Sequence, residues 1–157
     1  MKAVIQRVSQ AEVRVDGKVT GSIGKGLLVF VCALPGDDIS DSRVMAAKIA
    51  NMRIFRDEND KMNLSVLDVD GEVLVVSQFT LGADIRKGTR PSFICAMSPD
   101  LAEKEYENFL SEMRATGVKN VEAGIFGADM KVSLLNDGPV TILADTAIWN
   151  RKKDDRS

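Results

Sequence analysis

Histidine is absent from the 157-residue sequence. Without an imidazole, a Ser-His-Asp triad and a Cys-His pair are both excluded, and so is a catalytic zinc site of the common histidine-containing kind. The two cysteines are distant in the chain and the carboxylates are scattered, so the sequence predicts no metal site and no cofactor. Hydrolysis by this chain would therefore have to depend on carboxylates, on backbone dipoles or on groups of the substrate itself.

Cysteine and long hydrophobic runs are also scarce. Cys32 in "LLVFVCAL" and Cys95 in "SFICAM" interrupt apolar runs, which predicts two buried small side chains without a disulfide. No stretch is long enough to cross a bilayer, and the N-terminal "MKAVIQRV" alternates like a strand, where a signal peptide would carry a continuous apolar block. We therefore expect a cytoplasmic protein that does not enter a membrane.

The composition is that of a globular domain, with 45% hydrophobic and 28% charged residues. A net charge of −2 means that the molecule as a whole does not attract nucleic acid. Two local basic clusters remain, "RKGTR" at 86–90 and the C-terminal "RKKDDRS". No linker or repeat divides the chain, so we expect a single domain over 1–150 and a solvated, charged tail over 151–157.

Alternating and continuous apolar patterns indicate the secondary structure. Residues 2–33 predict a hairpin that turns at Asp16-Gly17, followed by a buried strand. Residues 40–52 predict a helix, and Ser98-Pro99-Asp100 begins a second one that Gly117 ends. Further strands are expected at "EVLVVSQFT" (Glu72 to Thr80), "KNVEAGIF", "ADMKVSLL" and "VTILADT". The pattern predicts an α/β fold with mixed, mostly antiparallel sheets in a barrel-like or sandwich arrangement and two principal helices.

Two short motifs stand out against this background. The strand "EVLVVSQFT" ends in two hydroxyls, an amide and an aromatic ring at Ser77, Gln78, Phe79 and Thr80. In "LLNDGPVT", Gly138-Pro139 lies between two apolar runs, although Pro cannot donate to a strand ladder and restricts the residue before it. Each motif alone has an ordinary interpretation, a solvated strand end in the first case and a broken loop in the second.

Taken together with "GIFGADM", these motifs make the sequence similar to the D-aminoacyl-tRNA deacylases, formerly called D-tyrosyl-tRNA deacylases. The resemblance extends over nearly the whole chain, through "MKAVIQRVSQAEVRVDG", "KIANMRIFRDENDKMNLSVLDV", "EVLVVSQFTL", "RKGTRPSF" and "FGADMKVSLLNDGPVT". It implies hydrolysis of the ester between a D-amino acid and the 3′ acceptor end of tRNA, as proofreading in translation. It also implies a homodimer with active sites at the subunit interface.

The same resemblance assigns roles around the Gly-Pro motif. In the family the Gly138-Pro139 bond is cis and its loop enters the active site of the partner subunit, Arg7 holds the loop, and Asn136 and Asp137 fix the turn. Backbone atoms that crowd the place of an L side chain would reject L substrates without recognising any D side chain. Glycine, with hydrogen at both positions, should pass, so cleavage of glycyl-tRNA mischarged on tRNA-Ala is expected as well.

Catalytic roles fall on the strand end at 77–80. Backbone N–H groups around Gln78, Phe79 and Thr80 are suited to an oxyanion hole, and Gln78 to positioning the carbonyl or the water. Thr80 has been considered a nucleophile in the family, but no histidine is available as its base, so we assign it to positioning and look to the 2′-hydroxyl of the substrate instead. Phe126 and Met130 are suited to a pocket for the terminal adenine, with core packing as the alternative.

Some features leave alternatives open. Cys32 stands where the family usually has glycine, and Gly82 where an aromatic residue is common. The basic loop at Arg86 to Arg90 would suit acceptor-stem phosphates, and an ordinary solvated loop is an equal interpretation. A module that binds RNA ends or the ribosome without catalysis is the competing function, because nothing in composition or periodicity demonstrates catalysis.

Overall fold

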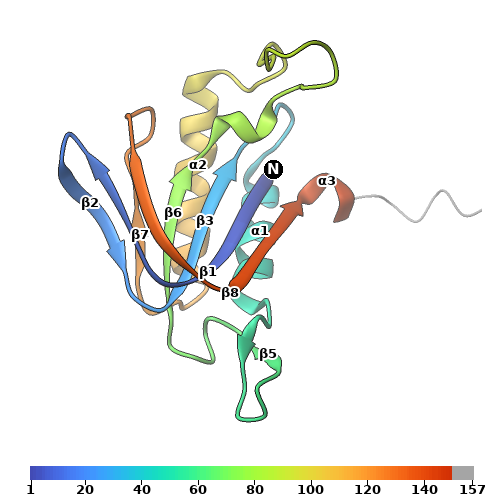
Figure 1. The fold of residues 1–157 in the computed structure, drawn as a ribbon. Helices are drawn as coiled ribbons and strands as arrows, with labels where there is room; N and C mark the ends of the chain where they lie inside the picture. The colour runs from blue at the N-terminus through green and yellow to red at the C-terminus, as the bar shows by residue number, and fades with distance from the viewer. Residues whose placement is uncertain (150–157) are drawn as a thin grey trace, which may run out of the picture.

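The structure, a computed structural model, describes residues 1–149, and the tail expected at 151–157 lies outside them. Its strands are β1 (Lys2–Val15), β2 (Lys18–Ile23), β3 (Gly26–Cys32), β4 (Phe55–Arg56), β5 (Met62–Leu64), β6 (Glu72–Ser77), β7 (Val121–Ala123) and β8 (Lys131–Asp145). Its helices are α1 (Ile39–Asn51), α2 (Pro99–Ala115), the short α3 (Thr146–Trp149) and the 3-10 helix η1 (Phe79–Gly82) (Figure 1).

The long strand β1 organises the main sheet. It pairs antiparallel with β3 through residues 2–8, with β2 through residues 11–15, and with β8 along nearly its whole length. Beyond β3, the strands β6 and β7 continue the sheet in parallel. The predicted mixed sheet is therefore confirmed, with antiparallel pairing around β1 and parallel pairing toward β7.

The sheet curls until its ends approach each other (Figure 1). A Cβ atom added to Gly21 in β2 would lie 2.8 Å from the carbonyl oxygen of Ala123 in β7 and 2.9 Å from the side chain of Leu74. Only glycine allows β2 to come this close to β6 and β7. The curled sheet encloses a small core of Val8, Ala11, Val13, Ile23, Leu28, Leu74 and Val76.

A second core lies between the sheet and the helices α1 and α2, which cover its other face (Figure 1). Fully buried side chains from both layers fill it, including those of Ile5, Leu27, Met45, Phe109 and Met113. Helix α1 begins with a capping box in which Asp38 and Asp41 satisfy each other's backbone N–H groups. Helix α2 begins at Pro99 as predicted, although the Ser98 side chain makes no capping hydrogen bond.

The structure corrects several expectations from the sequence. Strand β6 ends at Ser77 and does not reach Thr80, because its last pair with β3 is Ser77 with Val31 and the Gln78 N–H closes the ladder on the Val31 carbonyl. Hydrogen bonds from Leu81 to Gln78 and from Ala83 to Thr80 then form η1.

Other corrections concern the strands after α2 and the second cysteine. Only Val121–Ala123 of "KNVEAGIF" is a strand, and the two strands expected around the Gly-Pro motif form the single strand β8. Cys95 is exposed, whereas Cys32 is buried as expected, and both are free thiols. No helix within residues 1–149 is long and apolar enough to span a membrane.

Candidate active site

A cavity of ≈ 660 Å³ opens where β6 gives way to η1. One wall is the strand end with Ser77, Gln78 and Phe79, and the opposite wall is the turn after β7 with Phe126 and Met130. The segment leading into α2 completes the lining with Phe93, Ala96, Met97, Ser98, Pro99 and Ala102. Five of the residues predicted for the site, separated by some fifty positions in the sequence, thus face one cavity.

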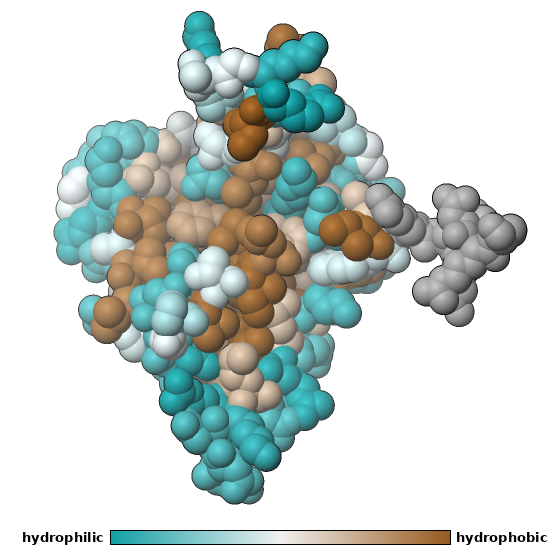
Figure 2. Space-filling view, turned by 45° about the vertical axis from the view of Figure 1, so that its right-hand side comes forward, coloured by the Kyte–Doolittle hydropathy of each residue, from teal (hydrophilic) through white to brown (hydrophobic). Residues whose placement is uncertain are grey.

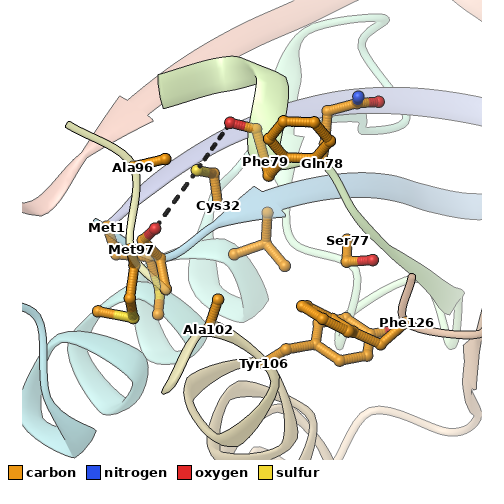
Figure 3. A pocket seen from close by; sticks show the side chains of 12 residues that line it. Met1, Cys32, Ser77, Gln78, Phe79, Ala96, Met97, Ala102, Tyr106 and Phe126 are labelled. Carbon is orange, nitrogen blue, oxygen red and sulfur yellow. Dashed lines mark hydrogen bonds between the residues drawn. The ribbon is translucent and has the colours of Figure 1, made fainter. Parts of the chain in front are cut away.

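Aromatic rings make up much of the lining. The rings of Phe79 and Phe93 meet edge to face, with their centroids 5.2 Å apart. The ring centroids of Phe126 and Tyr106 are 5.8 Å apart, and Figure 3 shows the two rings next to each other. Phe79 is 59% exposed, which is unusual for an aromatic side chain that lines a cavity. The site therefore offers flat apolar surfaces to a ligand, as a pocket for an unpaired base requires.

The side chains beneath the cavity are buried and hold the strand end in place. Tyr106 on α2 donates its hydroxyl hydrogen to the Val75 carbonyl (3.2 Å), and burial raises the pKa of Tyr106 to about 12. Cys32 lies under η1, with its Sγ 3.6 Å from the Phe79 carbonyl oxygen (Figure 3), and desolvation raises the pKa of its thiol. Cys32 is therefore a neutral donor rather than a reactive thiolate.

Polar groups at the cavity are few. The Gln78 side-chain amide donates to the Thr80 hydroxyl at 2.6 Å, which orients both residues. Thr80 is exposed, lies outside the lining of the cavity, and has no carboxylate hydrogen-bonded to it in the described part of the chain. Within residues 1–149 no group of three potential ligands is placed to hold a metal ion.

The structure reduces the number of backbone N–H groups near the strand end that could bind an oxyanion. The Gln78 N–H is occupied by the Val31 carbonyl at 2.8 Å, so it cannot also bind an oxyanion as the sequence suggested. The N–H groups of Phe79 and Thr80 lie at the start of η1, where the first N–H groups of a helix have no acceptor within the helix. These two groups remain as the backbone donors suited to a developing negative charge.

The loop that carries Gly138 and Pro139 is held by side-chain hydrogen bonds. The Gly138-Pro139 peptide bond is cis, as the resemblance implied, and Gly138 has φ +138°. Arg7 is only 3% exposed and donates from Nε to the Asp137 carbonyl (2.9 Å) and from Nη1 to the Ile54 carbonyl (2.6 Å). Arg7 is thus no ordinary surface residue, since it ties the loop to the segment before β4.

Asn136 braces the same loop from the other side. Its Oδ1 accepts from the Val140 N–H at 2.9 Å, and its Nδ2 donates to the Thr141 hydroxyl at 3.0 Å. Gly138 and Pro139 themselves are exposed and border a shallow hollow of ≈ 440 Å³ together with the β4–β5 hairpin. This hollow shares no lining residue with the cavity at Ser77. The two groups of predicted site residues therefore lie on separate surfaces of one chain.

Several lining residues were not identified from the sequence. Phe93, Ala96 and Met97 belong to the run "SFICAM", and the sequence assigned none of the three to the site. Tyr106 lies within the helix predicted from Ser98 to Gly117, but its contact with Phe126 was not predicted. The signal available was the apolar character of a segment that directly precedes a helix start, because ligand pockets are lined mainly by hydrophobic and aromatic side chains.

Comparison with solved structures shows which class of fold the chain has. Over 92% of this chain and 98% of the other, the structure resembles that of the c-Myc DNA Unwinding Element Binding Protein, with a TM-score of 0.86 and 42% sequence identity. A probable eukaryotic D-amino acid tRNA deacylase has the same fold, with a TM-score of 0.80 at 17% identity over 91% of this chain and 97% of that one. The chain is an α/β protein of this curled-sheet class.

Sequence comparison identifies the family. The model of the D-Tyr-tRNA(Tyr) deacylase family matches residues 4–145. The D-aminoacyl-tRNA deacylase of Paracoccus denitrificans is 58% identical over 147 residues, which cover 94% of this chain and 98% of that protein. This chain belongs to the D-Tyr-tRNA(Tyr) deacylase family.

Proposed function

We propose that the chain hydrolyses the ester bond of D-aminoacyl-tRNA and releases the free D-amino acid and tRNA. The observation that carries the proposal is the 58% identity, over 94% of the chain, to a protein named a D-aminoacyl-tRNA deacylase. The cavity supports it, because a terminal adenine needs flat apolar surfaces, and Phe126 and Phe79 offer them. An ester attached to that nucleotide would then lie near Ser77 and η1.

Water attacks the ester carbonyl in this proposal. The N–H groups of Phe79 and Thr80 stabilise the oxyanion, and Gln78 orients the carbonyl or the water. The Gln78 amide donates to the Thr80 hydroxyl at 2.6 Å, and an amide is not a base, so nothing within residues 1–149 is placed to activate Thr80 as a nucleophile. The vicinal 2′-hydroxyl of the terminal ribose supplies the orientation or activation of water that the chain lacks.

Rejection of L substrates is assigned to the Gly138-Pro139 loop of a second copy of the chain. Two observations support a homodimer with a shared site. The loop is exposed and rigidly braced by Arg7 and Asn136, yet in its own chain it lies away from the cavity. The sheet also has an apolar face that the helices do not cover, described below, which a second copy would bury.

The uncovered face carries a row of apolar side chains across three paired strands. Val4 of β1 pairs with Phe30 of β3 and with Leu143 of β8, and Leu143 is 80% exposed. Figure 2 shows apolar side chains gathered across the middle of the molecule on the side where Figure 1 places β1 and β8. Exposed apolar area of this kind is typical of an interface between subunits.

A release assay tests the activity directly. With D-tyrosyl-tRNA and L-tyrosyl-tRNA as substrates, the proposal expects rapid release of the D-amino acid and little release of the L-amino acid. Glycyl-tRNA should also be cleaved, because a filter that rejects an L side chain has nothing to reject in glycine. The relative named for DNA binding makes a non-catalytic module the alternative, and a protein that binds tRNA but leaves the D-ester intact would establish it.

Mixing two inactive variants tests the shared site. Gly138→Trp disables the loop, since even a Cβ there would lie 2.8 Å from the Arg7 guanidinium, and Gln78→Ala disables the cavity. After proven subunit exchange, mixed dimers contain one intact site, so part of the activity should return. Exchange without any return of activity contradicts a site shared between subunits.

The role of Thr80 is tested by two single changes. Thr80→Ala should retain measurable deacylation, whereas a D-aminoacyl-tRNA ending in 2′-deoxyadenosine should react about 10²- to 10⁴-fold more slowly, as loss of a general acid–base contribution implies. Normal turnover of the deoxy substrate, together with a covalent adduct on Thr80, would show instead that Thr80 is the nucleophile.

A further inference from the structure

The loop between η1 and α2 stands out from the body of the molecule (Figure 1, yellow-green, top). It is closed at its neck by two hydrogen bonds between Asp84 and Ser92, from N–H to O at 2.8 Å and 2.9 Å. We call residues 84–92 the basic arm. The two hydrogen bonds hold the ends of the arm together, so its tip projects from the molecule as a closed loop.

The tip of the basic arm carries two cations that have no anionic partner. Arg86 is neutralised by Asp84 through two contacts of 2.6 Å and 2.9 Å, and these contacts hold the pKa of the Asp84 carboxyl well below its usual range. Lys87 and Arg90 are exposed, and no carboxylate in the described part of the chain pairs with either. Two free positive charges thus project from a protein with a net charge of −2.

The basic arm is joined to the cavity of the proposed active site. Directly after its neck, Phe93 contacts Phe79 edge to face at 5.2 Å, and both rings line the cavity. Ala96 and Met97 then continue along the same wall. A ligand that places one end in the cavity and extends out as a polyanion would therefore pass beside the arm.

We infer that Lys87 and Arg90 bind backbone phosphates of the substrate's nucleic acid outside the cavity. The inference rests on the proposed function for the identity of the ligand, and it adds a second contact region to that substrate. Single phosphates are recognised by such exposed cations without reading sequence. The two side chains increase affinity for tRNA and leave the chemical step unchanged, because neither reaches the ester.

An anionic membrane is the other surface that suits this loop. Ile85 and Ile94 are 73% and 93% exposed beside the cations, and apolar side chains next to basic ones also bind lipid surfaces. The continuity of the arm with the cavity favours nucleic acid, since a membrane has no group that would occupy the cavity at the same time. The test therefore also measures binding to lipid vesicles.

The test compares Lys87→Gln/Arg90→Gln with a control of equal charge change, Lys18→Gln/Lys104→Gln, whose side chains are exposed and away from the cavity lining. Two substrates are used, D-tyrosyl-tRNA and D-tyrosyl-adenosine, which has no phosphate. The arm variant should show a raised KM and unchanged kcat on D-tyrosyl-tRNA, and parental kinetics on D-tyrosyl-adenosine. The control should match the parent on both.

The dependence of tRNA affinity on salt concentration gives a quantitative test. Loss of two phosphate contacts lowers the slope of log affinity against log salt by about two, so raising salt from about 50 to about 200 mM should weaken the arm variant about tenfold less than the parent. Equal slopes for variant and control, or an equal loss on D-tyrosyl-adenosine, would overturn the inference. So would binding to phosphatidylserine vesicles that depends on Lys87 and Arg90 while tRNA binding does not.

The experiment distinguishes failure of the proposed function from failure of the inference about Lys87 and Arg90. If the parent cleaves neither substrate, the function is wrong, and affinity for uncharged tRNA still measures the arm. An arm variant that binds uncharged tRNA as tightly as the parent, with the same salt slope, overturns the inference even if deacylation is confirmed.

Discussion

Arg7 illustrates how a buried charge acts at the scale of one residue. Its guanidinium is planar and donates in two directions at once, to the carbonyls of Asp137 and Ile54. A charged group at 3% exposure is tolerated only because its donors are satisfied. The loop bearing Gly138 and the segment before β4 are therefore held at a fixed separation by one side chain.

Arg7→Lys should cost about 1.5–3 kcal/mol of unfolding free energy, because a single ammonium cannot reach both carbonyls and a hydrogen bond to a charged group is lost. Deacylation should fall further than stability predicts, since the loop loses its brace. Arg14→Lys, at an exposed arginine on the same strand, should change stability by less than about 0.5 kcal/mol. Urea unfolding checks both variants, and a loss in Arg7→Lys as small as that of the control would contradict the bracing role.

Tyr106 is the only tyrosine in the chain, so its titration can be followed without ambiguity. Burial raises its pKa from 10.0 to about 12. The raised pKa stabilises the folded protein below pH 10, and this contribution is lost as pH rises from 10 to about 12. Absorbance of tyrosinate near 295 nm should show a midpoint near 12 while circular dichroism shows the fold intact, and Tyr106→Phe should abolish the transition. A midpoint near 10 in folded protein would be inconsistent with the buried position.

At the scale of elements, the approach of β2 to β7 is what closes the curled sheet. Gly21→Ala places a methyl group 2.8 Å from the Ala123 carbonyl oxygen, which is backbone and cannot move aside cheaply. We expect a loss of about 1–3 kcal/mol in unfolding free energy, which is about 2–12 °C in Tm for a chain of this size.

Gly24→Ala is the matched control for Gly21→Ala. An added Cβ there meets only the Glu72 carboxylate at 3.5 Å, an ordinary contact, so stability should stay the same or rise slightly. Thermal unfolding followed by circular dichroism measures both variants. Equal stability of the two would mean that β2 and β7 are not tightly apposed in solution.

In the whole molecule, the helices cover one face of the sheet and leave the other uncovered. One face is covered by α1 and α2 (Figure 1). The opposite face encloses the small core and also carries the paired Val4, Phe30 and Leu143, of which Leu143 is 80% exposed. An uncovered apolar face and an exposed loop that lacks a site in its own chain are both accounted for by a second copy. This is the basis for expecting activity only in the dimer.

Leu143→Glu should dissociate the proposed dimer, because a carboxylate would have to be buried without a partner in the apolar interface that the proposal places there. Val44→Glu, on an exposed position of α1 at 42% exposure, is the control and should leave the dimer intact. Sedimentation velocity gives the oligomeric state, and deacylation should fall with the dimer fraction. A Leu143→Glu protein that is monomeric and fully active would contradict the shared site.

Local sequence patterns were enough to predict both long helices and the approximate positions of β1, β2, β3 and β6. Apolar periodicity predicted α1 and α2 nearly to the residue, because caps and first-turn prolines act locally. The absence of histidine removed whole classes of hydrolase, and the order of motifs indicated the family that comparison then identified. These inferences needed only neighbours in the chain, so no tertiary structure was required.

Which distant residues come into contact could be learned only from the folded chain. Strand β6 stops at Ser77, where its pairing with β3 ends, and nothing in "SQFT" itself predicts this end. Phe93 lines the cavity through a contact with Phe79 across a loop, and Arg7 is buried because Asp137 and Ile54, distant in sequence, each present a carbonyl to it. The cavity and the Gly138 loop fall on separate surfaces for the same reason: sheet pairing fixes long-range distances, and pairing is a property of several strands together.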